Sequence, residues 1–336
     1  MMHKLKVIIA IGLILGLAAC STPPPPDAAR AGLTGRLVLI EYNPNGDKLI
    51  EQDLKSGDTK VLFQAPKNSL LTEARVSPDG TQILLVYAPP PPGNQVQFGY
   101  SDLYLLPLDG TSQPQPFMMR GDQEESFYFS AWAPDGSAIY FTHSYRTNPN
   151  SDVPKYQNDI ESVTLSMEKK TVIQNALWPA ISPDGTKLAY LVTNPDTLGD
   201  DLYLANLDGS NPAPVLQGTN PPVDVHLFSK DGDNLIFSMV NAQNASADST
   251  WLDKLFGIQV ASAHSVPSDW YLAPLSGGTP QRLTKLKDLN LNGQLSPDGS
   301  QMAFVAASGL YVINVDGTNL VKLSNGTYDG TVDWIP

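Results

Sequence analysis

The stretch Ser77-Pro78-Asp79-Gly80 is followed by the apolar run Ile83-Leu84-Leu85-Val86, and the chain repeats this arrangement. In the four-residue unit, proline presets φ at the second position, aspartate suits the third, and glycine adopts a positive φ at the fourth, which predicts a type I turn. Five copies occur: Ser77-Pro78-Asp79-Gly80, Ala133-Pro134-Asp135-Gly136, Ser182-Pro183-Asp184-Gly185, Ser229-Lys230-Asp231-Gly232 and Ser296-Pro297-Asp298-Gly299. Asp and Gly persist in every copy. We therefore assign each aspartate a role in its turn rather than in catalysis or metal binding.

Two further elements recur around each turn. An apolar strand is expected immediately before it, ending in Val76, Trp132, Ile181, Phe228 or Leu295. Downstream comes another strand that runs into a second turn, best seen in Leu103-Tyr104-Leu105-Leu106-Pro107-Leu108-Asp109-Gly110. Related copies start at Leu49, Ile160, Leu202, Trp270 and Leu310. A unit that recurs roughly every 40 to 70 residues indicates a repeat architecture, in which each unit forms one supersecondary element.

The two ends of the repeat array complement each other. The final stretch, Thr331 to Pro336, matches the strand that precedes each turn and breaks off where the next turn would begin. The array opens at Arg36-Leu37-Val38-Leu39-Ile40-Glu41 without such a strand. We therefore predict that the C-terminal strand completes the first blade and closes a ring, so that neither terminal blade keeps a long open edge.

The predicted fold class is all-β, a six-bladed β-propeller of four-stranded antiparallel blades. Low charge (16%), abundant proline (29 residues) and frequent Asp-Gly pairs fit short strands joined by turns. The expected blades are 34–66 with 330–336, 67–122, 123–175, 176–219, 220–286 and 287–329.

The Ser-Pro-Asp-Gly unit and its partner ending in Asp-Gly resemble the WD-like "Pro-Asp" propeller repeat. That repeat is found in the TolB-type periplasmic propeller and in the N-terminal domain of dipeptidyl-peptidase-IV-like enzymes. The resemblance covers residues 34–336 and implies the propeller fold. It implies little about activity, because propellers host many unrelated functions.

The N-terminus has the form of a secretory signal over residues 1–19. Lys4 and Lys6 precede an uninterrupted apolar run of 13 residues that ends at Ala19. This run is too short to span a bilayer as a helix, which takes about 20 residues. Leu17-Ala18-Ala19-Cys20 resembles the bacterial lipoprotein cleavage box. The resemblance implies cleavage before Cys20 and acylation of that cysteine, which would anchor the protein to a membrane.

Residues 20–33 are expected to form a tether between this anchor and a single propeller domain at 34–336. The four prolines Pro23 to Pro26 favour an extended, semi-rigid chain. The expected location is therefore extracytoplasmic, on the outer side of the bacterial cytoplasmic membrane, in the periplasm or at the outer membrane.

The net charge argues against nucleic acid as a partner. It is −13 at neutral pH, whereas a nucleic-acid-binding protein needs a basic surface. Cys20 is the only cysteine, so the fold must be held by its buried core rather than by an intramolecular disulfide.

The sequence contains no known catalytic motif. It has no G-x-S-x-G, H-E-x-x-H, P-loop or G-x-G-x-x-G pattern, so we expect no cofactor and no metal. Only Asp224 and His226 are arranged suggestively, because residues two apart on a strand point to one face. They could share a hydrogen bond or bind a metal, and we favour an imidazole oriented by a carboxylate in a packed strand. His143 is expected in a long polar loop, 142–159.

Polar residues on the innermost strands are the candidates for binding at the channel mouth. They are Glu73, Arg75, Tyr128, Asp224, His226, Asn292, Gln294 and Asp333. Trp132, Trp178 and Trp334 belong to the same strands, where we expect them to pack blade against blade.

Three insertions interrupt the ring. One contains the prolines Pro89 to Pro92, the second is 142–159, and the longest, 240–268, lies in blade five. Ser249 is expected to cap a short helix in the longest insertion, with Leu252, Leu255 and Phe256 on one face. Such a helix could cap the channel, dock a partner or touch the membrane, and we favour packing against its own propeller.

These features predict a lipid-anchored, extracytoplasmic propeller that acts as a binding or scaffold module for a protein or envelope glycan, without catalysis. One alternative is a propeller enzyme, a glycan lyase or hydrolase with its site at the channel mouth. Another is a purely structural member of an envelope assembly. The expected partners are the membrane, through acylated Cys20, and an unknown envelope component.

Overall fold

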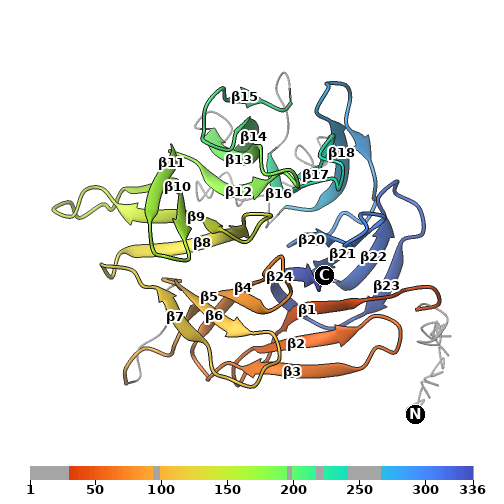
Figure 1. Cartoon of the computed structure of the whole chain (residues 1–336), viewed down its shortest axis with the longest axis horizontal. Helices are drawn as coiled ribbons and strands as arrows, with labels where there is room; N and C mark the ends of the chain where they lie inside the picture. Colours follow the sequence, from red (N-terminus) through yellow and green to blue (C-terminus); the bar gives the residue numbers. More distant parts are fainter. Residues whose placement is uncertain (1–29, 94–98, 195–198, 217–221, 241–265, 336) are drawn as a thin grey trace, which may run out of the picture.

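Six four-stranded antiparallel sheets surround a common centre (Figure 1). The computed structural model describes residues 30–93, 99–194, 199–216, 222–240 and 266–335. Over these residues the chain forms strands β1 to β24. The prediction of an all-β propeller with six blades is confirmed.

The four strands of each blade run from the centre of the ring outwards. From innermost to outermost, blade one contains β24 (Tyr328–Trp334), β1 (Arg36–Glu41), β2 (Lys48–Asp53) and β3 (Thr59–Gln64). Blade two contains β4 (Leu70–Val76), β5 (Gln82–Ala88), β6 (Asp102–Pro107) and β7 (Gln115–Met118). Blade three contains β8 (Glu125–Trp132), β9 (Ala138–Arg146), β10 (Tyr156–Thr164) and β11 (Lys169–Gln174).

The other three blades follow the same order. Blade four contains β12 (Leu177–Ile181), β13 (Lys187–Asn194), β14 (Gly199–Asn206) and β15 (Ala213–Pro214). Blade five contains β16 (Val223–Phe228), β17 (Asn234–Val240), β18 (Ser268–Pro274) and β19 (Gln281–Arg282). Blade six contains β20 (Asn292–Leu295), β21 (Gln301–Ala306), β22 (Gly309–Asn314) and β23 (Val321–Ser324).

The last strand closes the ring, as predicted. In β24, Trp334 pairs with Leu37 and Asp333 pairs with Val38 of β1. The amide of Ile335 then donates a hydrogen bond of 2.9 Å to the carbonyl of Arg36. Strands from the two ends of the array therefore share one sheet, and β24 covers the inner edge of β1.

The turn unit has the geometry that its sequence predicts. In the first copy, the amide of Gly80 donates to the carbonyl of Ser77 over 2.8 Å, which is the closing bond of a type I turn. The carboxylate of Asp79 accepts hydrogen bonds from the Ser77 hydroxyl and the Thr81 amide. Gly80 has φ 68°, a value that glycine adopts without strain. Each aspartate of the five copies has its pKa lowered by such bonds.

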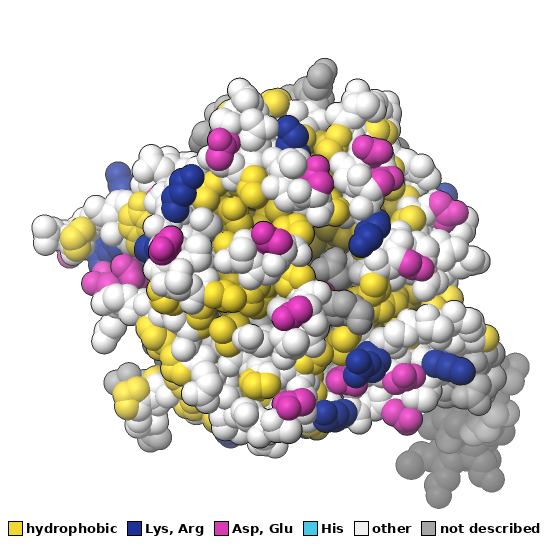
Figure 2. Space-filling view, in the orientation of Figure 1, with side chains coloured by type: hydrophobic (Ala, Val, Ile, Leu, Met, Phe, Trp, Pro, Cys, Tyr) yellow, Lys and Arg dark blue, Asp and Glu magenta, His cyan; other side chains and the backbone are white. Residues whose placement is uncertain are grey.

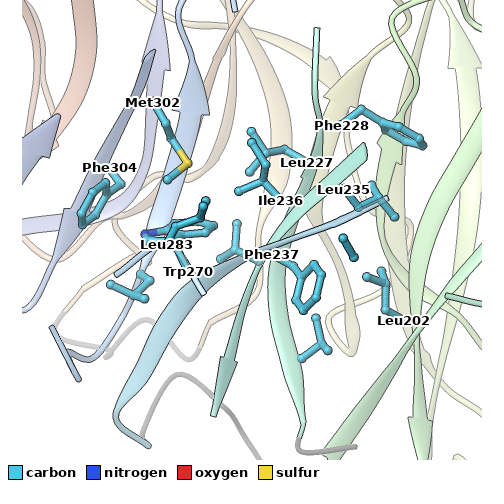
Figure 3. Packing of buried hydrophobic residues seen from close by; sticks show 14 of the residues in the cluster. Leu202, Leu227, Phe228, Leu235, Ile236, Phe237, Trp270, Leu283, Met302 and Phe304 are labelled. Carbon is cyan, nitrogen blue, oxygen red and sulfur yellow. The ribbon is translucent and has the colours of Figure 1, made fainter. Parts of the chain in front are cut away.

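The core lies between the blades. Trp270 is fully buried, and Figure 3 shows it with Met302 and Phe304 on one side and Phe237 on the other. These residues come from blades five and six, so the cluster joins neighbouring sheets. Because each sheet buries both faces against its neighbours, strands such as β5 (QILLVYA) are almost continuously apolar.

The expectation of a long loop at 142–159 is wrong. Strand β9 continues to Arg146 and β10 begins at Tyr156, so only 147–155 connects them. His143 lies on β9 and is buried. The segment is polar because its strands pair polar side chains inside the protein. For example, the Tyr145 hydroxyl donates to Asp159 over 2.8 Å, and His143 Nδ1 lies 3.3 Å from Glu161.

Several expectations fall outside the described residues. They are the signal segment, acylated Cys20, most of the tether and the helix expected after Ser249. The described ends of the longest insertion, Val240 and Ser268, pair with each other across β17 and β18. Among the residues that the structure describes, no helix has the length and apolar character needed to cross a membrane.

Candidate functional site

A cavity of about 510 Å³ opens where the innermost strands reach their turns. We call it the turn-side mouth. Because all six innermost strands occupy the same place in their blades, their carboxyl ends meet at this end of the ring. The residues that line it include Arg75, Trp132, Trp178, His226, Lys230, Gln294, Asp333 and Trp334.

A second cavity of about 400 Å³ opens near the other end of these strands, and we call it the opposite mouth. Its lining includes Glu73, Arg75, Tyr128, Phe129, Trp178, Asn292 and Asp329. Arg75 and Trp178 line both cavities, so they lie between them. Figure 2 shows hydrophobic side chains gathered around the hollowed middle of one face, with charged side chains spread outside it.

The turn-side mouth has a polar half and an apolar half. The penultimate residue of every innermost strand lines it. In blades six, one and two these residues are Gln294, Asp333 and Arg75. In blades three, four and five they are Ala131, Ala180 and Leu227. The repeat therefore places six equivalent positions around the mouth, and the residue types at those positions make it asymmetric.

Asp333 ties the last strand to blade two. Its Oδ2 accepts a hydrogen bond of 2.7 Å from the amide of Val76, and its Oδ1 accepts one of 2.8 Å from the amide of Trp334. Burial raises the pKa of Asp333, although Arg75 and these amides act in the opposite direction. The carboxylate is thus occupied by the backbone at the junction of two blades.

Glu73 has the same role between blades two and three. Its carboxylate accepts hydrogen bonds from the amides of Phe129 and Ser130 and from the Ser130 hydroxyl. Burial raises the pKa of Glu73, whereas Arg75 and the three donors lower it. Both buried acids therefore use their oxygens to join innermost strands that share no β-ladder.

Arg75 lies near both acids without binding to either. Its side chain forms no hydrogen bond and no ion pair with the residues that the structure describes, and its Nε is buried without a partner. The guanidinium still influences both carboxylates through space, because it lowers the pKa of Glu73 and of Asp333. Both carboxylates therefore lie in the field of the guanidinium, while its Nη groups, unlike the buried Nε, remain available.

Asp224 and His226 are both buried, and the imidazole contacts the backbone carbonyl of Asp224. The pairing of β16 with β17 is irregular between Val223 and His226, so the simple alternation of sides is broken. The imidazole Nδ1 lies 3.3 Å from the backbone carbonyl of Asp224. Burial lowers the pKa of His226, which favours the neutral ring. No group of three or more metal-ligating residues occurs in the described part of the chain.

An aromatic pair borders the opposite mouth, and one of its members, Trp178, also lines the turn-side mouth. The rings of Phe129 and Trp178 stack with centroids 3.8 Å apart and planes 9° apart. Both residues have positive φ, 51° and 59°, which is rare for bulky side chains and costs backbone strain. The irregular register of β8 and β12 at these positions accommodates them. Trp178 also lies 6.3 Å from the ring of His226.

The predicted candidates divide between the two mouths. Arg75, His226, Gln294 and Asp333 line the turn-side mouth. Glu73, Arg75, Tyr128 and Asn292 line the opposite mouth. Asp224 lines neither cavity.

Two residues that line these cavities, Phe129 and Lys230, were not among the predicted candidates. Phe129 follows Tyr128 directly, and its position depends on a strand irregularity that has no plain sequence signal. Lys230 had a signal, because it replaces the proline of the turn unit in blade five. It lines the turn-side mouth, and its stem packs against Gly299 of the next turn.

Comparison with known proteins supports the TolB-type resemblance. No family model matches the chain. The Tol-Pal system protein TolB of Francisella tularensis subsp. tularensis (strain WY96-3418) is 25% identical over 149 residues, which cover 41% of this chain and 29% of that protein. The TolB protein of Francisella tularensis subsp. mediasiatica (strain FSC147) is 24% identical over 149 residues, which again cover 41% of this chain and 29% of that protein. The match thus spans less than a third of these curated relatives.

Solved structures show the same fold. TolB from Acinetobacter baumannii superposes with a TM-score of 0.63 at 14% identity, over 90% of this chain and 67% of that one. Putative TolB from Agrobacterium tumefaciens gives 0.59 at 16% identity, over 90% and 100%. Oligogalacturonate lyase in complex with manganese gives 0.54 at 17% identity, over 83% and 71%. The chain is therefore a TolB-like propeller in architecture, and its neighbours include both TolB proteins and an enzyme.

Proposed function

We propose that this protein is a lipid-anchored, extracytoplasmic propeller that binds a protein partner of the cell envelope at its turn-side mouth. The observation that carries the proposal is the asymmetric ring of six equivalent positions around a cavity of about 510 Å³. Loops and ends of a rigid scaffold are where binding residues usually lie. The likeness to proteins of the Tol-Pal system supports an envelope role.

The anchor in this proposal is Cys20. The cleavage-box resemblance of Leu17-Ala18-Ala19-Cys20 and the proline-rich stretch that follows support a lipoprotein on a short tether. Replacing the cysteine, Cys20→Ser, should move the protein from the membrane fraction to the soluble fraction. It should also abolish incorporation of a labelled fatty acid. Retention of both the label and the membrane location in Cys20→Ser would refute the anchor.

Site-specific photocrosslinking tests the partner surface. A photoreactive residue is placed at Ala180 in the mouth or, as a matched control, at Ala213 on the outermost strand β15 of the same blade. Irradiation of intact cells should give a discrete crosslinked species from position 180 and none from 213. An excess of soluble propeller should compete it away. Identical patterns from both positions, or no crosslink at all, would contradict the proposal.

A glycan lyase or hydrolase is the alternative function. Two observations favour it. The fold resembles that of an oligogalacturonate lyase, and burial lowers the pKa of His226 at the turn-side mouth, which favours a neutral imidazole. The double variant Asp224→Asn with His226→Gln should then lose turnover on a panel of envelope polysaccharides. Unchanged turnover in the double variant, or none in the wild type, would remove this assignment.

A further inference from the structure

We propose that the turn-side mouth binds an acidic segment whose carboxylate contacts Arg75 on blade two. Lys230, on blade five, attracts the carboxylate from across the mouth, and an apolar group of the segment packs beside Lys230 in the apolar half. The occupant is an acidic segment of a protein partner, and the proposal rests on the function proposed above. It adds the chemistry of recognition and the two residues that supply it.

The first support is the unused guanidinium of Arg75. A buried or partly buried arginine normally binds carboxylates directly, since its planar donors match their two oxygens. Glu73 and Asp333 are close enough to influence Arg75 through space, yet their oxygens accept bonds from backbone amides instead. The Arg75 side chain thus forms no hydrogen bond or ion pair with the described residues, and Arg75 lines the cavity. Its donors are available to a ligand.

The second support is Lys230, where the chain departs from its own repeat. The other four turns carry proline at this position, namely Pro78, Pro134, Pro183 and Pro297. Lys230 packs its stem on Gly299, where an added Cβ would lie 2.3 Å from the lysine Cβ. Its ammonium group forms no hydrogen bond or ion pair with the described residues. The substitution gives up a turn constraint and adds a cation at the mouth.

The charges distinguish the two ends of the channel. The lining of the turn-side mouth contains two cations, Arg75 and Lys230, and one carboxylate, Asp333, which the backbone already occupies. At the opposite mouth, Arg75 is accompanied by Glu73 and Asp329. A local excess of positive charge on a chain of net charge −13 favours an anion at the turn-side mouth.

The apolar half sets the second requirement. Ala131, Ala180 and Leu227 face the polar residues across the mouth, so a bare anion would leave half of the surface without a contact. An acidic side chain next to an aliphatic one in a peptide satisfies both halves. This is why we assign the site to an acidic protein segment rather than to an inorganic anion.

Short blocked peptides test the proposal with the propeller domain in its full chain. The probe is acetyl-Ser-Leu-Glu-Ser-amide, and its neutral isostere carries Gln in place of Glu. A third peptide, acetyl-Ser-Leu-Ser with a free C-terminus, distinguishes a terminal from a side-chain carboxylate. Binding is followed by calorimetry and by the fluorescence of the tryptophans at the mouth. The Glu peptide should bind about tenfold or more tightly than the Gln peptide.

Two variants assign the effect to the proposed residues. Arg75→Gln should abolish the preference for Glu over Gln, and Lys230→Pro should reduce it while restoring the turn residue of the other blades. Lys285→Gln is the control, since this exposed lysine lies outside the mouth. Thermal unfolding verifies that each variant is folded, and Arg75→Lys, which keeps the charge, should retain part of the preference.

The outcomes separate this inference from the proposed function. Equal binding of the Glu and Gln peptides, absence of binding by any carboxylate peptide, or an unchanged preference in Arg75→Gln would overturn the carboxylate site. Tight binding of the free-terminus peptide alone would keep the carboxylate and reassign it to a chain end. A partner crosslinked at Ala180 equally in wild type and Arg75→Gln would refute the inference while leaving the proposed function intact.

Discussion

The carboxylate of Asp333 accepts a hydrogen bond of 2.7 Å from the backbone amide of Val76, a residue 257 positions earlier in the chain. The last strand, β24, is thereby joined to the second blade, while it also forms a ladder with β1 in the first blade. Closure of the ring therefore depends on a side chain as well as on strand pairing.

Removal of this carboxylate should weaken the closure. Asp333→Ala leaves the buried amide of Val76 without an acceptor, which costs about 1–3 kcal/mol of the free energy of unfolding. Urea unfolding of the variant measures the loss. Asp329→Ala, an exposed position on the same strand, is the control and should stay within about 0.5 kcal/mol of wild type. A similar loss in both variants would mean that the bond to Val76 is not the cause.

Glu73 should give stability an unusual dependence on pH. Burial raises its pKa above the ordinary value of 4.5, so the folded protein holds the proton more tightly than the unfolded chain. Its contribution is therefore greatest below pH 4.5 and declines as the pH rises towards the folded-state pKa. The stability of wild type relative to Glu73→Gln should fall across this window. A difference that is flat with pH, or that rises with it, would contradict the assignment.

The ring was predictable because its determinants are local and repeated. The turn at Ser77 to Gly80 needs only four residues, and its bonds lie within the unit. The closing strand was predictable because residues 331–336 match the strand that precedes each turn, and the first blade has no copy of that strand before Arg36 to Glu41. Both features can be seen by aligning the chain with itself.

The centre of the ring was less predictable, because it depends on contacts between blades. The positive φ of Phe129 and Trp178 has no counterpart in their residue types. His143 was assigned to a loop because its neighbours are polar, yet Glu161, which lies 3.3 Å from it, is supplied by another strand. The free donors of Arg75 depend on where the amides of blades two and three point. Such relations appear only when the blades are placed together.

The turn aspartates should act on stability in the opposite direction to Glu73. The Ser296 hydroxyl and the Ser300 amide and hydroxyl lower the pKa of Asp298 to about 2. Its contribution is present above the ordinary value of 3.8 and is lost as the pH falls through the folded-state value. Wild type should therefore be more stable than Asp298→Asn near neutrality, and the two should converge near pH 2. Asp233→Asn, next to another turn, controls for the loss of one negative charge.

Two glycines with similar φ should tolerate alanine very differently. Gly330 has φ 66°, and an added Cβ would lie 1.7 Å from the carbonyl oxygen of Thr72 in the next blade. Gly136 has φ 71°, with nothing within 4 Å. Gly136→Ala should cost about 1–2 kcal/mol from strain alone. Gly330→Ala should cost more than about 3 kcal/mol, since the backbones of two blades must separate. Equal losses on thermal unfolding would show that space at Gly330 does not matter.

Restoring the turn residue of blade five should stabilise the fold. The amide of Gly232 donates to the carbonyl of Ser229 over 2.9 Å, as in the turns that carry proline, so position 230 has the backbone that proline requires. Lys230→Pro should therefore raise the free energy of unfolding by about 0.4–1 kcal/mol, because it restricts the unfolded chain. Lys230→Ala, which removes the cation without the constraint, should give no such gain.

The same variant should weaken carboxylate binding, so stability and recognition are expected to change in opposite directions. This trade-off gives a physical reason for a lysine where four sister turns have proline. Chemical unfolding and peptide titration of the same Lys230→Pro preparation measure both quantities. A variant that is less stable than wild type would mean that blade five has a different turn geometry. A variant that is more stable and binds the Glu peptide as tightly as before would show that Lys230 does not contact the ligand.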